Sequence, residues 1–161
     1  MESALLALAG GLQAAGLENW ARGTAWVYPV ANVLHVLGVV MLVGAIGVVD
    51  LRIVGFWHRL PLLALSRALT PIAVAGLAVQ VLSGLVLFAA DGEALARSAT
   101  FHLKLVLLAL VLINAAAFRW HWRRHATGFG YRPTTPVRLS ALTSIALWLG
   151  VATVGRLIAY Y

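Results

Sequence analysis

Four stretches of the sequence are long and apolar enough to cross a lipid bilayer as helices. The hydrocarbon core of a bilayer is about 30 Å thick, so a helix that spans it needs about 20 consecutive apolar residues. The stretches cover residues 26–49, 71–90, 101–118 and 137–160. We therefore expect an all-α fold, an integral membrane four-helix bundle that forms a single domain over residues 1–161.

The composition agrees with a chain whose surface meets lipid. The sequence is 62% hydrophobic and 11% charged, and its mean hydropathy is +0.93. A soluble domain of this length needs a polar surface, which such a composition cannot supply. The sequence contains no cysteine, which excludes disulfides, thiolate metal sites, iron–sulfur clusters and covalently attached haem.

Positive charge is concentrated in two of the segments that connect the apolar stretches. The net charge is +7. In a soluble protein this charge would suggest nucleic-acid binding, but here the positive-inside rule for membrane proteins explains it. We therefore expect no nucleic-acid partner. The rule places residues 50–70 and 119–137 in the cytoplasm of a bacterium, and both termini on the periplasmic side of its inner membrane. The arginines in these segments are Arg52, Arg59, Arg67, Arg119, Arg123, Arg124 and Arg132, and Arg138 follows directly after the second segment.

Local signals suggest where several helices begin and end. The threonine–proline pairs at 70–71 and 135–136 predict helix starts, because a capping hydroxyl precedes a proline in the first turn. Asp91-Gly92 predicts a turn after the second stretch. Residues 3–20 place leucines on one helical face, which predicts a short interfacial helix on the outer surface.

The acidic residues are few and lie near the expected helix ends. Asp50 and Arg52 close the first stretch on its cytoplasmic side, and we expect them to pair with each other or with the arginine-rich segment that follows. On this interpretation no carboxylate lies in the hydrocarbon core, so a proton relay of carboxylates across the membrane is not expected.

Polar side chains within the apolar stretches are the candidate functional residues, because polar groups are expensive at membrane depth. His35, Gln80, Lys104 and Thr153 all fall in the outer half of the expected bundle. His102 is two residues from Lys104 and therefore faces away from it. The alternative for His35 is a structural histidine that bonds Gln80 or a backbone carbonyl, and for Lys104 it is extension to the outer interface.

Short motifs in the first and third stretches resemble those of known membrane proteins. They are Tyr28-Pro29, His35-Val36-Leu37-Gly38, Gly44 and Asp50-Leu51-Arg52, followed by Phe101, Lys104-Leu105 and Asn114. Over most of residues 26–120 the chain resembles a family of bacterial four-helix integral membrane proteins. That family is distantly similar to the membrane domain of the copper-resistance protein CopD and to HemJ-type protoporphyrinogen oxidases. The resemblance implies a protein that binds haem b or moves copper. Unlike copper-handling proteins, however, the chain lacks methionine-rich and histidine-rich stretches that would bind the metal.

Together these features predict a small membrane redox protein that binds b-type haem between its helices, for electron transfer or porphyrin-linked oxidation. A four-helix bundle can hold a flat porphyrin between helices, and neutral imidazole is a common axial ligand. We expect His35 to bind the iron and Gln80 to lie beside it. Lys104 is expected as the opposite ligand or as a partner of a propionate, with His102 as the fallback metal ligand. Arg156 would supply a second positive charge for the propionates.

Two other functions remain open at this point. One is a cofactor-free accessory or structural subunit of a larger membrane complex, since small residues on the helix faces permit close packing against a partner. The other is copper transport. For the redox function, the expected electron partner is a quinone or a periplasmic redox protein. The sequence does not decide whether the protein is an enzyme.

Overall fold

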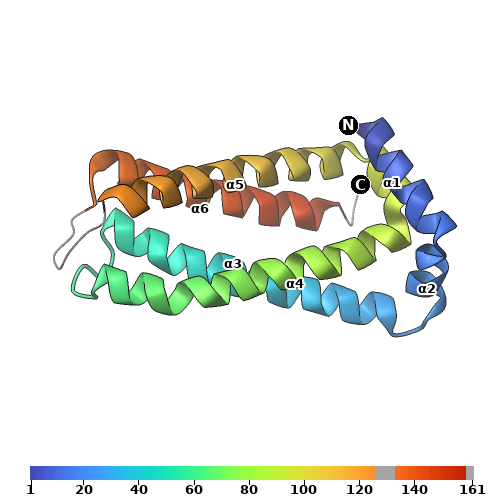
Figure 1. Ribbon diagram of the computed structural model, residues 1–161, viewed down its shortest axis with the longest axis horizontal. Coiled ribbons are helices and arrows are strands. Elements are labelled where there is room, and N and C mark those ends of the chain that lie inside the picture. Colours follow the sequence, from blue (N-terminus) through green and yellow to red (C-terminus); the bar gives the residue numbers. More distant parts are fainter. Residues whose placement is uncertain (126–132, 159–161) are drawn as a thin grey trace.

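The computed structural model describes residues 1–125 and 133–158, and the side chains of all of these except residues 121–125. Over the described residues the fold is all-helical (Figure 1). Four helices are long and apolar enough to cross a membrane, which confirms the four apolar stretches. The helices are α1 (Glu2–Ala14), α2 (Leu17–Gly23), α3 (Val27–Val54), α4 (Leu62–Arg97), α5 (Ala99–His125) and α6 (Thr135–Leu157).

The long helices form two antiparallel hairpins, α3 with α4 and α5 with α6 (Figure 1). The hairpins meet through α3 and α6, so the spatial order is α4–α3–α6–α5. Although α4 and α5 are separated in the chain only by Ser98, they make the least contact of any neighbouring pair and diverge from their connection. The α1 and α2 helices lie across the end of α4. We call this end of the bundle the α1/α2 end. The opposite end, where residues 55–61 connect α3 to α4, is called the loop end.

Glycines allow α3 and α4 to cross with their backbones in contact. A Cβ atom added at Gly76 would lie 2.6 Å from the backbone nitrogen of Leu42 and 3.0 Å from the carbonyl oxygen of Gly38. A Cβ at Gly38 would in turn lie 3.0 Å from the carbonyl oxygen of Gly76. Small residues at such crossings let helices approach closely in lipid. This crossing sets the spacing of the polar groups beside it, His35 before Gly38 on α3 and Gln80 and Ser83 after Gly76 on α4.

Two clusters of buried apolar side chains hold the hairpins together. Leu42, Val111 and Trp148 form one in the middle of the bundle. The second lies at the loop end and contains Ile53, Leu62, Val137 and Ala141. Both clusters lie away from the α1/α2 end, where the intramembrane polar residues of the sequence are found.

The second long helix begins earlier than the sequence indicated. We expected its start at Thr70-Pro71, but α4 begins at Leu62 and Pro71 lies inside it. A proline within a helix removes one backbone hydrogen bond, and membrane helices tolerate it when neighbouring groups satisfy the backbone. The carbonyl that loses its donor here is that of Arg67, four residues before Pro71, while the neighbouring Thr70 hydroxyl donates to the carbonyl oxygen of Ser66 at 2.6 Å. The turn expected at Asp91 is a kink, with non-helical φ and ψ of −121° and 24°, after which α4 continues to Arg97.

The N-terminal region contains two helices where a single short helix was expected. Gly16 separates α1 from α2 and adopts a φ of +75°, a conformation that glycine reaches without steric penalty. At the kink of α4, Arg22 of α2 donates to the carbonyl oxygen of Ala90 at 2.6 Å and forms an ion pair with Asp91. This polar contact ties the N-terminal helices to the end of α4.

Candidate functional site

The imidazole of His35 is held between α3 and α4 in a defined orientation. Its Nδ1 atom lies 3.0 Å from the hydroxyl oxygen of Ser83. Gly84 leaves room for the ring, because a Cβ there would lie 3.3 Å from the Cε1 atom of His35. The Nε2 atom makes no hydrogen bond to the residues that the structure describes. One edge of the ring is therefore fixed by α4, and the nitrogen on the other edge is left to bind another group.

The hydrogen bonds of Ser83 favour one tautomer of the His35 ring. A serine hydroxyl has one hydrogen, and its shortest contact with an acceptor is the carbonyl oxygen of Val79 at 2.6 Å. With the hydrogen directed there, the Ser83 oxygen accepts from Nδ1–H of His35. In the neutral ring this arrangement places the lone pair on Nε2, the form in which imidazole coordinates a metal.

Gln80 supports the same region through the backbone. Its side-chain amide donates to the carbonyl oxygen of His35 at 2.7 Å. The sequence placed Gln80 beside His35 as a possible partner of the imidazole. The side chain that the ring bonds is Ser83, and the backbone of Gln80 is a second hydrogen-bonding neighbour of the ring. Ser83 was missed as a site residue, although it lies three residues after Gln80 on the same face of α4. That spacing is the signal that could have found it.

Lys104 extends from α5 toward α6 and reaches the vicinity of His35. A Cβ at Gly155 would lie 3.5 Å from Cε and 3.6 Å from Nζ of Lys104, so the missing glycine side chain makes room for the lysine. The ammonium group is within electrostatic range of the His35 imidazole. The structure thus brings a histidine of one hairpin and a lysine of the other into the same region.

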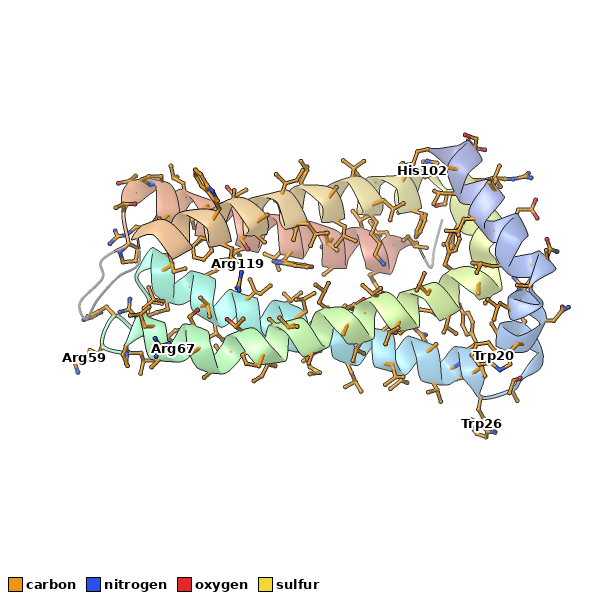
Figure 2. All side chains as sticks on the ribbon, viewed as in Figure 1. Trp20, Trp26, Arg59, Arg67, His102 and Arg119 are labelled. Atoms are coloured by element: carbon orange, nitrogen blue, oxygen red, sulfur yellow. The ribbon has the colours of Figure 1, made fainter. Side chains whose placement is uncertain are left out.

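The remaining predicted site residues lie at the α1/α2 end, and within the described part of the chain no hydrogen bond or ion pair joins them to His35. Figure 2 shows His102 near the start of α5, at the α1/α2 end of the bundle. Its Nε2 atom is buried and has no hydrogen-bond partner in the described part of the chain. Arg156 is exposed in the last turn of α6, and Thr153 is exposed one turn earlier.

A second interhelical polar pair lies between α5 and α6. Its Asn114 belongs to the motif noted in the sequence, but its pairing with Ser140 was not predicted. The side-chain amide of Asn114 donates to the carbonyl oxygen of Ser140 at 3.1 Å, and the Ser140 hydroxyl donates back to Oδ1 of Asn114 at 2.9 Å. Both atoms of the amide are therefore satisfied within the bundle. This pair has the character of a structural link, whereas His35 keeps an uncommitted nitrogen.

Chemically, the arrangement offers one oriented imidazole with a nearby cation. Among the described residues, no three histidine, cysteine, aspartate or glutamate side chains gather in a group that could hold a metal ion by themselves. A porphyrin differs from a bare ion in this respect, because its four nitrogens supply most of the iron ligands and the protein contributes one or two. Comparison of the chain with family models, with curated proteins and with solved structures found no match.

Proposed function

We propose that this chain is an integral membrane protein that crosses the bilayer four times through α3, α4, α5 and α6. Support comes from the outward faces of these helices, which carry large apolar side chains. Val33 is 60% exposed, Leu82 66% and Ile113 65%. A continuous apolar surface of this kind would be unstable in water, whereas lipid solvates it without penalty.

We propose further that the loop end faces the cytoplasm of a bacterial inner membrane and the α1/α2 end faces the periplasm. Figure 2 shows Arg59 and Arg67 at the loop end, and Trp20 and Trp26 at the α1/α2 end. Arginines retained on the cytoplasmic side and tryptophans at an interface are the usual pattern. In this orientation α1 and α2 lie on the periplasmic surface of the inner membrane, and His35 lies in the periplasmic half of the bilayer.

Within this bundle, His35 is proposed as an axial ligand of b-type haem, in a protein of electron transfer or porphyrin-linked oxidation. The observation that carries this proposal is the Ser83 hydroxyl, which binds Nδ1–H and so leaves the lone pair of Nε2 available to iron. Haem-binding and metal-binding histidines are oriented by such a partner on the other ring nitrogen. When bound, haem b would supply one-electron redox chemistry.

The other residues of the region fit a porphyrin's charged edge. The ammonium group of Lys104, within electrostatic range of His35, could neutralise a propionate. Arg156 lies near the end of α6, at the same end of the bundle. The proposed electron partner is a membrane quinone or a periplasmic redox protein, since either reaches the half of the membrane where His35 lies.

A visible absorption spectrum of the protein, purified after expression with ample haem, tests this function. We expect a Soret band in the wild type and its loss in His35→Ala. Ser83→Ala retains the ligand but frees the ring, and should lower haem affinity by about 10- to 100-fold. His58→Ala, which changes an exposed loop histidine, is the matched control and should leave the spectrum unchanged. A wild type without porphyrin would overturn the proposal.

A second candidate function is that of a cofactor-free accessory subunit of a larger membrane complex. The observation that favours it is Gly44, where an added Cβ would meet nothing within 4 Å. Unlike Gly38, which is used within the chain, this exposed glycine leaves α3 open to close approach by a helix of another protein. A colourless protein that copurifies with other membrane subunits, and loses them in Gly44→Leu, would favour this function over haem binding.

A further inference from the structure

The segment that connects α3 to α4 at the loop end is held in a defined turn by Arg52. The guanidinium group of Arg52 donates to the backbone carbonyls of Leu60 and His58, each at 2.8 Å. The backbone N–H of Leu60 also donates to the carbonyl oxygen of Trp57 at 2.8 Å. These bonds brace residues 55–61 against the end of α3.

Trp57 has a backbone conformation that favours glycine. Its φ is +48°, in the left-handed region that bulky residues rarely adopt. Its side chain is exposed together with that of Phe56, at 54% and 57%, and the two ring centroids lie 6.2 Å apart. Strained residues of this kind cluster at functional sites, where the surrounding structure holds them in place. The braced turn thus presents two aromatic rings on its outer surface.

The arginines beside this turn have no carboxylate partner. Arg59 and Arg67 are exposed, and neither makes a hydrogen bond or an ion pair with any residue that the structure describes. The two ion pairs found among those residues both lie at the opposite end of the bundle, around the kink of α4.

The sequence cannot supply the missing negative charge at the loop end. Asp50 lies deeper than the sequence indicated, because α3 continues past it to Val54, and it is only 7% exposed. Its hydrogen-bonding neighbour is Ser144 of α6, while Arg52, its expected partner, bonds the loop. The counter-charge for Arg59 and Arg67 must therefore come from outside this sequence. The other acidic residues all belong to the α1/α2 end and are Glu2, Glu18, Asp91 and Glu93.

The length of α3 places residues 55–61 at the depth of the lipid headgroups. Its 28 residues span about 42 Å, whereas the hydrocarbon core is about 30 Å thick and the bilayer with its headgroups about 40–45 Å. Trp26, at the start of α3, marks the opposite interface (Figure 2). The loop therefore reaches the headgroups of the other leaflet, and Arg67, in the second turn of α4, lies about 8 Å closer to the hydrocarbon.

Aromatic rings and unpaired arginines at this depth match an anionic phospholipid. Tryptophan is enriched at the headgroup level, and basic residues at the cytoplasmic surface attract anionic lipids. We propose that residues 55–61 bind an anionic phospholipid of the cytoplasmic leaflet. Arg59 binds its phosphate, Arg67 supplies a second positive charge nearer the hydrocarbon, and Phe56 and Trp57 contact its glycerol and upper acyl groups. Such a site rests on the membrane topology proposed above, but not on haem.

Native mass spectrometry of the purified protein tests this preference, with phosphatidylglycerol and phosphatidylcholine of identical acyl chains as probes. An arginine near an anionic lipid contributes about 1 kcal/mol, which is about fivefold in affinity. Phosphatidylglycerol should bind more tightly than phosphatidylcholine. Arg59→Gln should lower its affinity about fivefold, and Arg59→Gln with Arg67→Gln about 25-fold. Arg97→Gln, which removes an exposed arginine at the α1/α2 end, is the matched control and should leave both affinities unchanged.

Nuclear magnetic resonance of the indole N–H groups in lipid nanodiscs locates the bound lipid. Trp57→Gly identifies the Trp57 signal by its loss and retains the turn, because glycine reaches a φ of +48° without steric penalty. Replacing part of the phosphatidylcholine by phosphatidylglycerol should shift the Trp57 signal in the wild type and leave it in place in Arg59→Gln.

Three results would overturn the proposal. The first is equal affinity of the wild type for the two lipids. The second is a loss of phosphatidylglycerol affinity in Arg97→Gln as large as in Arg59→Gln, which would mean that any surface arginine attracts the lipid. The third is a Trp57 signal that phosphatidylglycerol does not move, which would leave the loop to a partner in the cytoplasm. Each variant is first shown to be folded by its helix content. An absent Soret band would refute the haem function without changing either measurement.

Discussion

Replacing Gly76 with alanine should force α3 and α4 apart at their crossing. The added Cβ would lie 2.6 Å from the backbone nitrogen of Leu42 and 2.9 Å from Cβ of Met41. Ordinary van der Waals contact begins at 3.4 Å, so the helices must separate by about 0.8 Å. The atom in the way belongs to the backbone, which cannot rotate aside as a flexible side chain can.

The expected loss of stability follows from this displacement. Overpacking of a well-packed contact costs about 1–3 kcal/mol. A shift of about 0.8 Å also stretches the bonds from Gln80 and Ser83 to His35, which are 2.7 and 3.0 Å long, and interhelical bonds in membranes contribute about 0.6 kcal/mol each. Alanine regains about 1 kcal/mol of helix propensity. The net destabilisation of Gly76→Ala should be about 2 kcal/mol.

Unfolding by sodium dodecyl sulfate in mixed micelles, followed by circular dichroism, measures this difference. Gly44→Ala is the matched control, because its Cβ meets nothing within 4 Å. It should leave the free energy of unfolding unchanged or raise it by up to about 1 kcal/mol. If Gly76→Ala proved as stable as Gly44→Ala, the close crossing of the two backbones would be refuted.

Three further predictions concern other contacts. Asn114→Ala should lower the free energy of unfolding by about 1–2 kcal/mol, and a double-mutant cycle with Ser140→Ala should show coupling; additive effects would contradict the reciprocal bonds. A thiol introduced as Arg59→Cys should react with an impermeant reagent only after cells are opened; labelling of intact cells would invert the topology. Arg22→Gln should make α1 and α2 more sensitive to limited proteolysis, while the free energy of unfolding changes by less than about 1 kcal/mol, as for a surface ion pair. Arg97→Gln is the control. Equal protection of the two variants would show that Arg22 does not hold the N-terminal helices against α4.

The membrane-length helices could be predicted because their signal is composition over a long window. Four apolar stretches of sufficient length appear as the four long helices, whatever the details of their packing. Helix boundaries were predicted less well, because Pro71 has two interpretations. It is favourable in the first turn of a helix and tolerated in the interior of a membrane helix, and the sequence around it does not distinguish these cases.

The polar region was predicted in part. Gly76, Gln80 and Ser83 share one face of α4, as the helical period requires, and this face lies against α3. The assignment of partners was not predictable, since Gln80 and Ser83 are both within reach of His35 and the choice depends on the rotation of α3. The burial of Asp50 was missed because its apparent partner, Arg52, finds backbone carbonyls in the following turn.

Ser98 alone connects α4 to α5, and with them the two hairpins. Its hydroxyl accepts from the backbone N–H of Phe101 at 3.3 Å, and the rings of Phe88 and Phe101 stack beside it with centroids 5.8 Å apart. Two buried clusters join the hairpins away from this connection, Leu42 with Val111 and Trp148, and Ile53 and Leu62 with Val137 and Ala141. The relative position of His35 and Lys104, which belong to different hairpins, therefore depends on side-chain packing far along the bundle and not on the short connection at Ser98.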